Sequence, residues 1–366
     1  RDKNNIYDIN KSIHYLSLAS KNDNMYAAFI LGLIYFDNQK IPRDIDKSIY
    51  YFTLSANLNY PDAQYNLGVI YYKGQYIKQD VNKAIYYFSQ AAEQNNSKSQ
   101  YNLGYIYYKG EFVERDIVKA MKYFTLSANQ NNKCAQFALG IIYFNGECGN
   151  YDINKSIHYF QLAADHNDSD AQFVLGLFYI AGTYLHQNIK KGIYYLTLSS
   201  KNRSINAHFA LGFLYHEGKY VKRDIEQSIK YYKEASSFNH QYAKNNLGII
   251  FKNGIEGHGQ NIGSAIEYFK EAIKQKNDEL SMYNLAHLYL YNENIDDAIE
   301  LLSKSLNRGF LPSKPLLCLA LIIKFNNNLE SIEKEICNIF ESETLALSII
   351  KMIETQKLII KSNFKE

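Results

Sequence analysis

The amino-acid sequence predicts an all-α protein, a right-handed α-solenoid superhelix of about nine stacked helical hairpins. Three observations support this class: a motif that recurs every 36 residues, small and apolar residues at helical spacing inside each unit, and only four prolines in 366 residues. One hairpin cannot bury its apolar face alone, so consecutive units must stack. One continuous solenoid therefore replaces the two or three globular domains that the length alone suggests.

The first helix of each unit is predicted from a Leu-Gly pair. A small residue lies five positions before the glycine and an aromatic residue three positions after it, so these side chains share one helical face. A second glycine, six positions after the first, falls where the helix should end, because glycine readily adopts the left-handed cap conformation. The pairs are Leu31-Gly32, Leu67-Gly68, Leu103-Gly104, Leu139-Gly140, Leu175-Gly176, Leu211-Gly212 and Leu247-Gly248.

The second helix follows a short polar link. We expect its N-cap at a recurring acidic or amide residue, since such side chains accept hydrogen bonds from the first turn. These residues are Asp8, Asp44, Asp80, Asp116, Asp152, Asn188, Asp224 and Asn261. Glycine inside a helix costs about 1 kcal/mol relative to alanine, so its recurrence at the centre of the first helix indicates close helix approach. We therefore expect the large aromatic residues of the second helix to pack over it.

The repeat defines three segments of the chain. Residues 1–24 supply the second helix of a truncated preceding unit, and residues 25–306 form tandem units, the last of them degenerate. An insertion is expected within 255–262, because the next equivalent pair, Leu285-Ala286, comes late. Residues 307–366 are predicted to be a further degenerate unit, with Leu319-Ala320 in place of Leu-Gly, and a helical C-terminal cap.

The unit AxxxLGxxYxxG…DxxKAxxYFxxAA resembles the Sel1-like repeat, a relative of the tetratricopeptide repeat. The matching residues in one unit are Ala63, Leu67, Gly68, Tyr71, Gly74, Asp80, Lys83, Ala84, Tyr87, Ala91 and Ala92. The chain departs from the family by having tyrosine at the usual tryptophan of the second helix, and it lacks the cysteine pairs of the secreted, disulfide-linked branch. The resemblance implies work as a protein–protein adaptor, including assembly of membrane-bound complexes, quality-control ligases and host-interaction factors.

No motif for catalysis, a metal or a cofactor is present. The sequence lacks GxxxxGK[ST], GxSxG, HExxH and a dinucleotide-binding GxGxxG. Gly254, Gly257 and Gly259 could form a phosphate cradle, but an insertion between two helices explains them better. His208 and His216 lie two helical turns apart, too far for one metal ion. We therefore expect no enzyme activity, no small-molecule substrate, no cofactor and no metal site.

Charge and hydropathy limit the partners. Forty basic residues against 37 acidic ones give a near-balanced chain, which argues against a nucleic-acid binder with a basic stripe. The longest apolar run, residues 316–323, is far shorter than the roughly 20 residues of a membrane helix. No apolar signal-like stretch opens the chain. We expect a soluble protein, with the cytoplasm favoured over the secretory lumen.

A ladder of polar and aromatic residues recurs in two adjacent units. In tetratricopeptide-like stacking the first helices line the concave face, and asparagine recurs there two positions before the glycine. Asparagine can both donate to and accept from a peptide amide, and lysine attracts carboxylates. The predicted peptide-binding groove consists of Tyr65, Asn66, Tyr72, Lys73, Tyr101, Asn102, Tyr108 and Lys109. Alternatively, residues 64–74 and 100–110 are recent duplicates and the ladder is inherited background.

The sequence thus predicts a non-catalytic scaffold or adaptor that presents a concave groove to a peptide or protein partner. The alternative is a permanent structural subunit of a larger assembly, for example a membrane-associated quality-control complex. A permanent subunit should expose a large apolar patch on the convex face or at the C-terminal cap, where residues 316–325 are unusually apolar.

Overall fold

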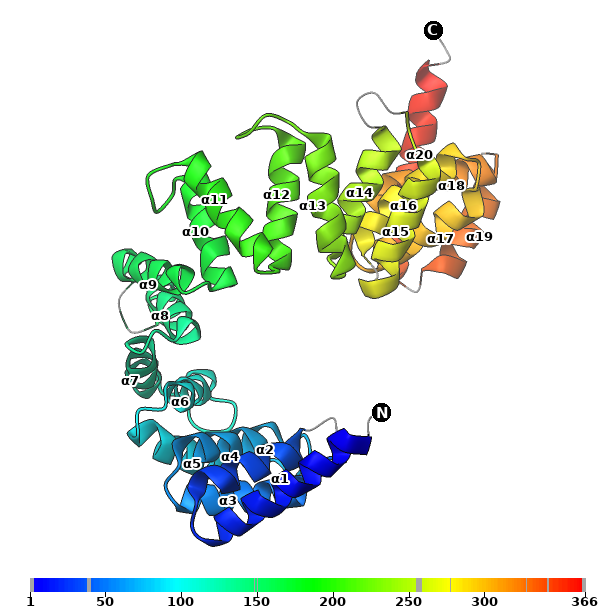
Figure 1. Ribbon diagram of the computed structural model, residues 1–366. Coiled ribbons are helices and arrows are strands. Elements are labelled where there is room, and N and C mark those ends of the chain that lie inside the picture. Colours follow the sequence, from blue (N-terminus) through cyan, green and yellow to red (C-terminus); the bar gives the residue numbers. More distant parts are fainter. Residues whose placement is uncertain are drawn as a thin grey trace. The chain divides into compact units, whose positions relative to one another are not determined.

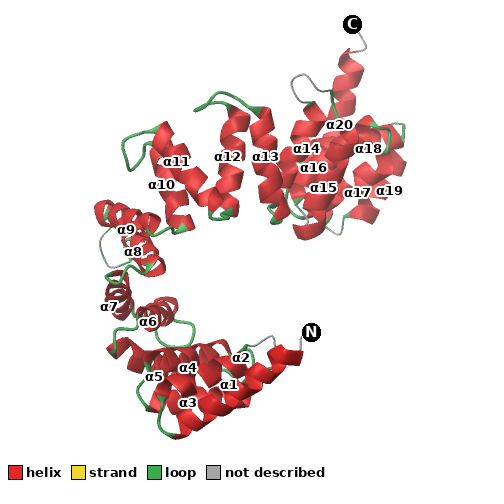
Figure 2. Ribbon diagram, viewed as in Figure 1, coloured by secondary structure: helices red, strands yellow, loops and turns green. Residues whose placement is uncertain are grey.

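The computed structural model describes residues 3–37, 41–147, 149, 151–254, 259–276, 278–326, 328–340 and 342–363. This described part of the chain contains twenty helices and no strand (Figures 1 and 2). The helices form two compact units, Arg1–Asn202 and Arg203–Glu366. The predicted all-α class of stacked helical hairpins is confirmed.

Unit 1 alternates two kinds of helix, which we call helix A and helix B after their order in each hairpin. The A helices are α2 (Met25–Phe36), α4 (Pro61–Lys73), α6 (Ser97–Lys109), α8 (Lys133–Asn145) and α10 (Ser169–Ala181). The B helices are α1 (Lys3–Lys21), α3 (Ile45–Asn57), α5 (Val81–Glu93), α7 (Ile117–Ala128), α9 (Ile153–Asp165) and α11 (Ile189–Lys201). Within unit 1, each helix from α1 to α10 packs against the helix that follows it in the chain (Figure 1).

Unit 2 continues the alternation and ends in a longer helix. Its A helices are α12 (Ile205–Glu217), α14 (Gln241–Asn253), α16 (Glu279–Tyr291) and α18 (Ser313–Lys324). Its B helices are α13 (Ile225–Ser237), α15 (Ile262–Lys276), α17 (Ile295–Asn307) and α19 (Leu329–Ile339). Helix α20 (Glu343–Asn363) packs against α18 and α19 as the predicted helical cap. Residues 255–258, where an insertion was expected, lie outside the described residues.

In the hairpins from α2–α3 to α14–α15, the core is a glycine of helix A under a large side chain of helix B. A Cβ atom on Gly68 would lie 2.5 Å from Cδ1 of Phe88, and both Leu67 and Phe88 are fully buried. Phe52, Phe124, Phe160 and Phe269 occupy the same place in their hairpins. This contact confirms that the glycine recurs because the B helix approaches too closely for any side chain.

The predicted caps are present in most units. Gly74, Gly110, Gly146, Gly182 and Gly218 end their A helices in the left-handed region, with φ between 60° and 71°. Asp44, Asp80, Asp116, Asp152, Asn188, Asp224 and Asn261 each accept a hydrogen bond from the backbone N–H three residues later. The prediction is wrong for Asp8, because α1 is continuous from Lys3 to Lys21 and Asp8 lies inside it.

Asparagine recurs at the helix ends of the repeat for a structural reason. After most B helices one residue adopts positive φ, where asparagine is among the best-tolerated non-glycine residues. Asn59, Asn95, Asn131, Asn167 and Asn239 have φ between 59° and 66°. Asparagine also provides the N-cap of several helices, such as Asn96 before α6 and Asn132 before α8. Much of the asparagine therefore serves the helix ends of the repeat.

The tyrosines that replace the family's tryptophan form stacked pairs at the edge of each hairpin. The rings of Tyr71 and Tyr87 are nearly parallel, with an interplanar angle of 8° and centroids 5.8 Å apart. Lys83 Nζ lies 5.1 Å from the centroid of the Tyr71 ring. Similar stacks occur in every hairpin from α2–α3 to α14–α15. Most of these rings are half-buried, and Tyr71 and Tyr87 pack against the apolar core of unit 1.

Helix α18 corrects the predicted register of the last unit. Leu317 and Cys318 are fully buried, whereas Leu319 is 47% exposed. Leu317-Cys318 therefore occupies the Leu-Gly position, two residues before the predicted pair. Most of the apolar run 316–325 packs inside the core of unit 2, and Leu319 and Ile323 are its markedly exposed residues.

Candidate functional site

The predicted groove residues lie on two adjacent A helices of unit 1. Helix α4 carries Tyr65, Asn66, Tyr72 and Lys73, and helix α6 carries Tyr101, Asn102, Tyr108 and Lys109. The regular repeat places each α6 residue in the position that its α4 counterpart holds one unit earlier. We call the surface that the A helices of unit 1 share the A face.

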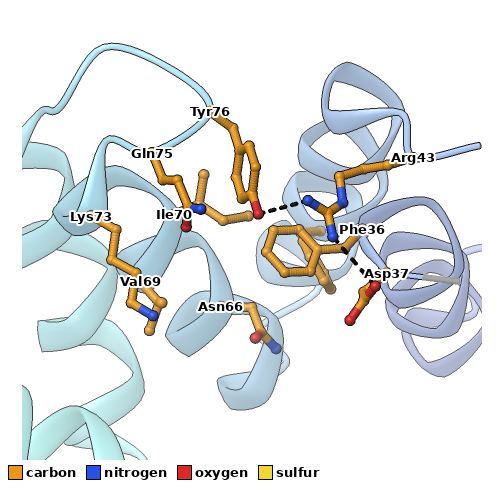
Figure 3. Close-up of a pocket in the computed structure, with 10 residues that line it drawn as sticks. Phe36, Asp37, Arg43, Asn66, Val69, Ile70, Lys73, Gln75 and Tyr76 are labelled. Atoms are coloured by element: carbon orange, nitrogen blue, oxygen red, sulfur yellow. Dashed lines mark hydrogen bonds and ion pairs between the residues drawn. The ribbon is translucent and has the colours of Figure 1, made fainter. Parts of the chain in front are cut away.

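A pocket of about 260 Å³ opens where α4 meets the preceding helix α2, and we call it the α2–α4 pocket (Figure 3). Apolar side chains and polar side chains both line it. Its lining residues are Phe36, Asp37, Arg43, Phe52, Asn66, Val69, Ile70, Lys73, Gln75 and Tyr76. Two residues of the predicted groove, Asn66 and Lys73, thus meet in one pocket.

Arg43 organises one wall of this pocket (Figure 3). Its Nη1 donates a hydrogen bond of 2.7 Å to the Tyr76 hydroxyl, and its Nη2 lies 3.4 Å from Oδ1 of Asp37. The guanidinium carbon is 4.9 Å from the centroid of Tyr76 and 5.9 Å from that of Phe36. Cation–π contact therefore holds two aromatic rings and one positive charge together.

Sequence reasoning missed Arg43, although a signal was available. Arg43 stands eleven residues after Gly32, in the link between two helices. At the same position in later units, a long polar side chain donates to a carbonyl at the end of helix A. These side chains are Gln79, Arg115, Gln187 and Arg223. A long donor at this position was therefore visible in the repeat.

Lys73 and Asn66 complete the opposite wall of the pocket. Lys73 is an exposed residue in the last turn of α4, and among the described residues no carboxylate lies within ion-pair distance of it. The Asn66 Nδ2 atom donates a hydrogen bond of 2.9 Å to the Asp62 carbonyl within α4. This bond leaves the amide oxygen of Asn66 available as an acceptor. The pocket thus combines an unpaired ammonium group with an amide.

Tyr65 and Tyr101 each pack mainly against the core of their own hairpin. Tyr65 lies with its ring centroid 6.1 Å from that of Phe88, and its hydroxyl interacts with the Asn102 side chain. Tyr101 packs in the same way on Phe124, at 5.8 Å. Burial raises the pKa of Tyr65, and chiefly burial raises that of Tyr101 to about 12. Neither tyrosine lines the α2–α4 pocket.

The remaining predicted residues lie further along the A face. The ring of Tyr72 meets Phe112 edge-on at 6.2 Å. The Tyr108 hydroxyl donates a hydrogen bond of 3.0 Å to Glu147. Lys109 is exposed, with its Nζ 5.7 Å from the centroid of Tyr105. The structure therefore distributes the eight residues over three successive junctions between A helices.

Two searches of the described residues bear on other kinds of site. No group of three or more histidine, cysteine, aspartate or glutamate side chains in the described ranges could hold a metal ion. Within the same ranges, no helix is both long enough and apolar enough to cross a membrane.

A tandem array of helical hairpins, most of them with a glycine under an aromatic residue, defines a helical-repeat solenoid. The Sel1 repeat family model matches residues 6–24, 26–60, 61–96, 97–132, 135–168, 169–204, 205–237, 241–277 and 280–310. The chain belongs to the Sel1 repeat family. The Sel1 repeat fold is generally a non-catalytic scaffold for protein interactions.

Solved structures show the same fold. A protective antigen present in uropathogenic Escherichia coli strains, which displays an SLR fold, is 23% identical with a TM-score of 0.73. That match covers 89% of this chain and 71% of the antigen. A Sel1 repeat protein from Oxalobacter formigenes is 23% identical with a TM-score of 0.62, over 85% of this chain and 92% of that protein. A search of curated proteins found no match.

Proposed function

We propose that this protein is a non-catalytic adaptor whose A face is a concave groove for an extended segment of a protein partner. The observation that carries the proposal is the α2–α4 pocket, where Asn66 and Lys73 lie beside the Arg43, Phe36 and Tyr76 cluster. A pocket with an apolar lining and a few polar groups at fixed positions suits a side chain of a bound peptide.

The rest of the predicted groove would extend the contact along the peptide. Lys109 offers an exposed cation, and Tyr72 and Phe112 offer an aromatic surface. Asn66 retains an amide oxygen that can accept a hydrogen bond from a peptide N–H group. Because Tyr65 and Tyr101 pack against the core, they would hold the groove residues in place without contacting the peptide themselves.

The alternative role as a permanent structural subunit gains less support. That role called for a large apolar patch on the convex face or at the C-terminal cap, where residues 316–325 were the candidates. Most of this run is buried in unit 2, where Leu317, Cys318 and Leu321 are fully covered. Within this run, Leu319 and Ile323 are the markedly exposed apolar residues, and scattered exposed apolar residues are ordinary on protein surfaces.

Selection from a phage-displayed library of random peptides by the immobilised full chain tests the groove. Selected peptides should bind the Asn66→Ala/Lys73→Ala double variant about tenfold or more weakly, because a hydrogen bond and a charge contact are lost. Lys190→Ala is a matched control, since Lys190 is an exposed lysine on helix B of the same unit. Peptides that bind all three chains equally would contradict the groove.

A further inference from the structure

The junction between α6 and α8 contains a carboxylate-binding arrangement that the chain fills by itself. Glu147 accepts hydrogen bonds from the Tyr108 hydroxyl at 3.0 Å and from Asn145 Nδ2 at 2.9 Å, and it pairs with the Arg115 guanidinium. Its side chain is only 17% exposed. Burial by itself would raise the pKa of Glu147, but the hydrogen bonds and the Arg115 charge outweigh it and lower that pKa. The charged carboxylate is thus stabilised there.

The α2–α4 pocket has counterparts of these residues at the same repeat positions, except for Glu147. Phe36 and Arg43 stand where Tyr108 and Arg115 stand, four and eleven residues after the glycine of the earlier A helix. Lys73 stands where Asn145 stands, five residues after the glycine of the later A helix. The position of Glu147, however, is held by the neutral residue Gln75, which is exposed at the pocket rim.

The charges of the pocket leave a cation without an internal partner. Its lining contains two cationic residues, Arg43 and Lys73, against one acidic residue, Asp37. Asp37 approaches Arg43 at 3.4 Å and is itself 75% exposed, so this ion pair is long and accessible to water. An exposed pair of this kind contributes little. Lys73 has no ion-pair partner in the described part of the chain.

The intervening junction, between α4 and α6, lacks this combination. Gln79 replaces the arginine, and its Nε2 donates to the Tyr72 carbonyl at 2.7 Å. The residue equivalent to Glu147 is Glu111, an exposed acid. A pocket with two cations, one exposed aspartate and no acid at the position of Glu147 therefore distinguishes the α2–α4 junction from the next two junctions.

We infer that the α2–α4 pocket binds the side-chain carboxylate of a glutamate in the partner segment, in the place that Glu147 takes at the α6–α8 junction. The inference rests on the proposed function, and it specifies the side chain of the bound peptide that the pocket would hold. Arg43 and Lys73 would contact the carboxylate, since charge-assisted hydrogen bonds to carboxylates are about twice as strong as neutral ones. Phe36 and Val69 line the pocket where the methylene groups would lie.

A bead library of C-terminally amidated hexapeptides, with either glutamate or glutamine at one fixed position, tests this inference on the full chain. The wild-type chain should retain the glutamate peptides about tenfold or more strongly than the glutamine peptides. Equal retention would overturn the glutamate anchor and leave the proposed groove intact. Retention of no peptide at all would overturn the groove itself. A preference that appears only with free C-termini would identify a terminal carboxylate and contradict the inference.

A self-filling variant gives the second measurement. Gln75→Glu supplies an internal carboxylate at the position of Glu147, so it should abolish the preference for glutamate peptides over glutamine peptides. Gln75→Ala is the matched control and should keep the preference. Both substitutions lie at an exposed residue, and circular dichroism should show unchanged helix content. A Gln75→Glu chain that still prefers glutamate would overturn the inference.

Discussion

The ring of Phe160 lies directly against the backbone of Gly140. A Cβ atom on Gly140 would be 2.6 Å from both Cδ1 and Cε1 of that ring, a separation that real Cβ atoms do not tolerate. Both residues are in the core of the α8–α9 hairpin, where Phe160 is 1% exposed. Glycine is a poor helix former, but it is used here because a larger residue would prevent the close packing of the two helices.

Gly140→Leu should destabilise the α8–α9 hairpin by about 3 kcal/mol or more, since overpacking forces the two helices apart. Thermal unfolding and limited proteolysis would measure this loss. Gly140→Ala combined with Phe160→Leu should be much milder, because Ala286 and Leu302 hold the corresponding positions in the core of unit 2. A Gly140→Leu chain with unchanged melting and protease resistance would refute the packing role.

In unit 1, a buried glutamine on each of four A helices, α4, α6, α8 and α10, links its hairpin to the preceding one. Gln100 is 1% exposed, its Nε2 donates to the Ala92 carbonyl at 3.2 Å, and its Oε1 accepts from Gln130 Nε2 at 2.8 Å. The same position and its partner in the neighbouring units are Gln64 with Gln94, Gln136 with His166, and Gln172 with Asn202. This ladder connects consecutive hairpins through hydrogen bonds in addition to apolar contact.

Gln100→Leu should cost about 2 kcal/mol, because it removes two hydrogen bonds and leaves the Ala92 carbonyl without its side-chain donor. Gln130→Ala should cost less, since Gln130 is exposed and water can replace it. Chemical denaturation of both single variants and the double variant forms a double-mutant cycle. A coupling energy of zero would show that the ladder contributes nothing to stacking.

The N-caps of helices α10 and α9 should respond to pH in opposite directions. Asp168 is buried, and burial raises its pKa even though it caps α10 through the Ala171 N–H at 2.9 Å. A raised carboxyl pKa means that the unfolded chain loses its proton first, so stability falls as pH rises through the unfolded value of 3.8. Asp152 caps α9, and its backbone hydrogen bond with Lys155 lowers its pKa, which stabilises the fold above the unfolded value.

Asp168→Asn should therefore raise the Tm at neutral pH, because asparagine keeps the cap without the buried charge, as Asn96 and Asn132 do in earlier units. The difference from wild type should vanish below about pH 3. Asp152→Asn, the matched control, should lower the Tm at neutral pH. Calorimetry at both pH values checks the pair, and a drop in Tm for Asp168→Asn at neutral pH would contradict the assignment.

The repeat predicted what depends on spacing alone. Hairpin order, the packing of Phe88 over Gly68 and the cap at Gly74 all follow from residues at fixed distances in the chain. The register of the last repeat was predicted wrongly because the links around it differ in length from the others. The pair at Leu319 was matched to the Leu-Gly position, whereas the buried residues at that position are Leu317 and Cys318. Asp8 matched the cap position of a helix that in fact begins earlier.

The candidate site was predictable only in part. Asn66 and Lys73 stood out because they recur, and both line the α2–α4 pocket. Arg43 was not predicted as a site residue because it lies in the link between two helices, and helical periodicity does not predict the path of such a link. Tyr65 and Asn102 were predicted as groove residues. Their side chains also interact with each other, between the neighbouring helices α4 and α6 of unit 1. The repeat period shows which side chains share one face of the A helices. Contacts between neighbouring hairpins then decide which of these side chains remain accessible to a partner.

Arg203 lies in the turn that follows helix α11, and it tests whether the left-handed conformation of this turn affects stability. It has φ of 63°, a left-handed conformation that costs most side chains roughly 1–2 kcal/mol. Asn59, Asn95, Asn131, Asn167 and Asn239 hold this position in other units. Arg203→Asn should therefore stabilise the protein by about 0.5–1 kcal/mol, and Asn95→Ala should destabilise it by a similar amount. Thermal unfolding of both variants would measure the effect, and shifts of the same sign would show that this turn conformation does not govern stability.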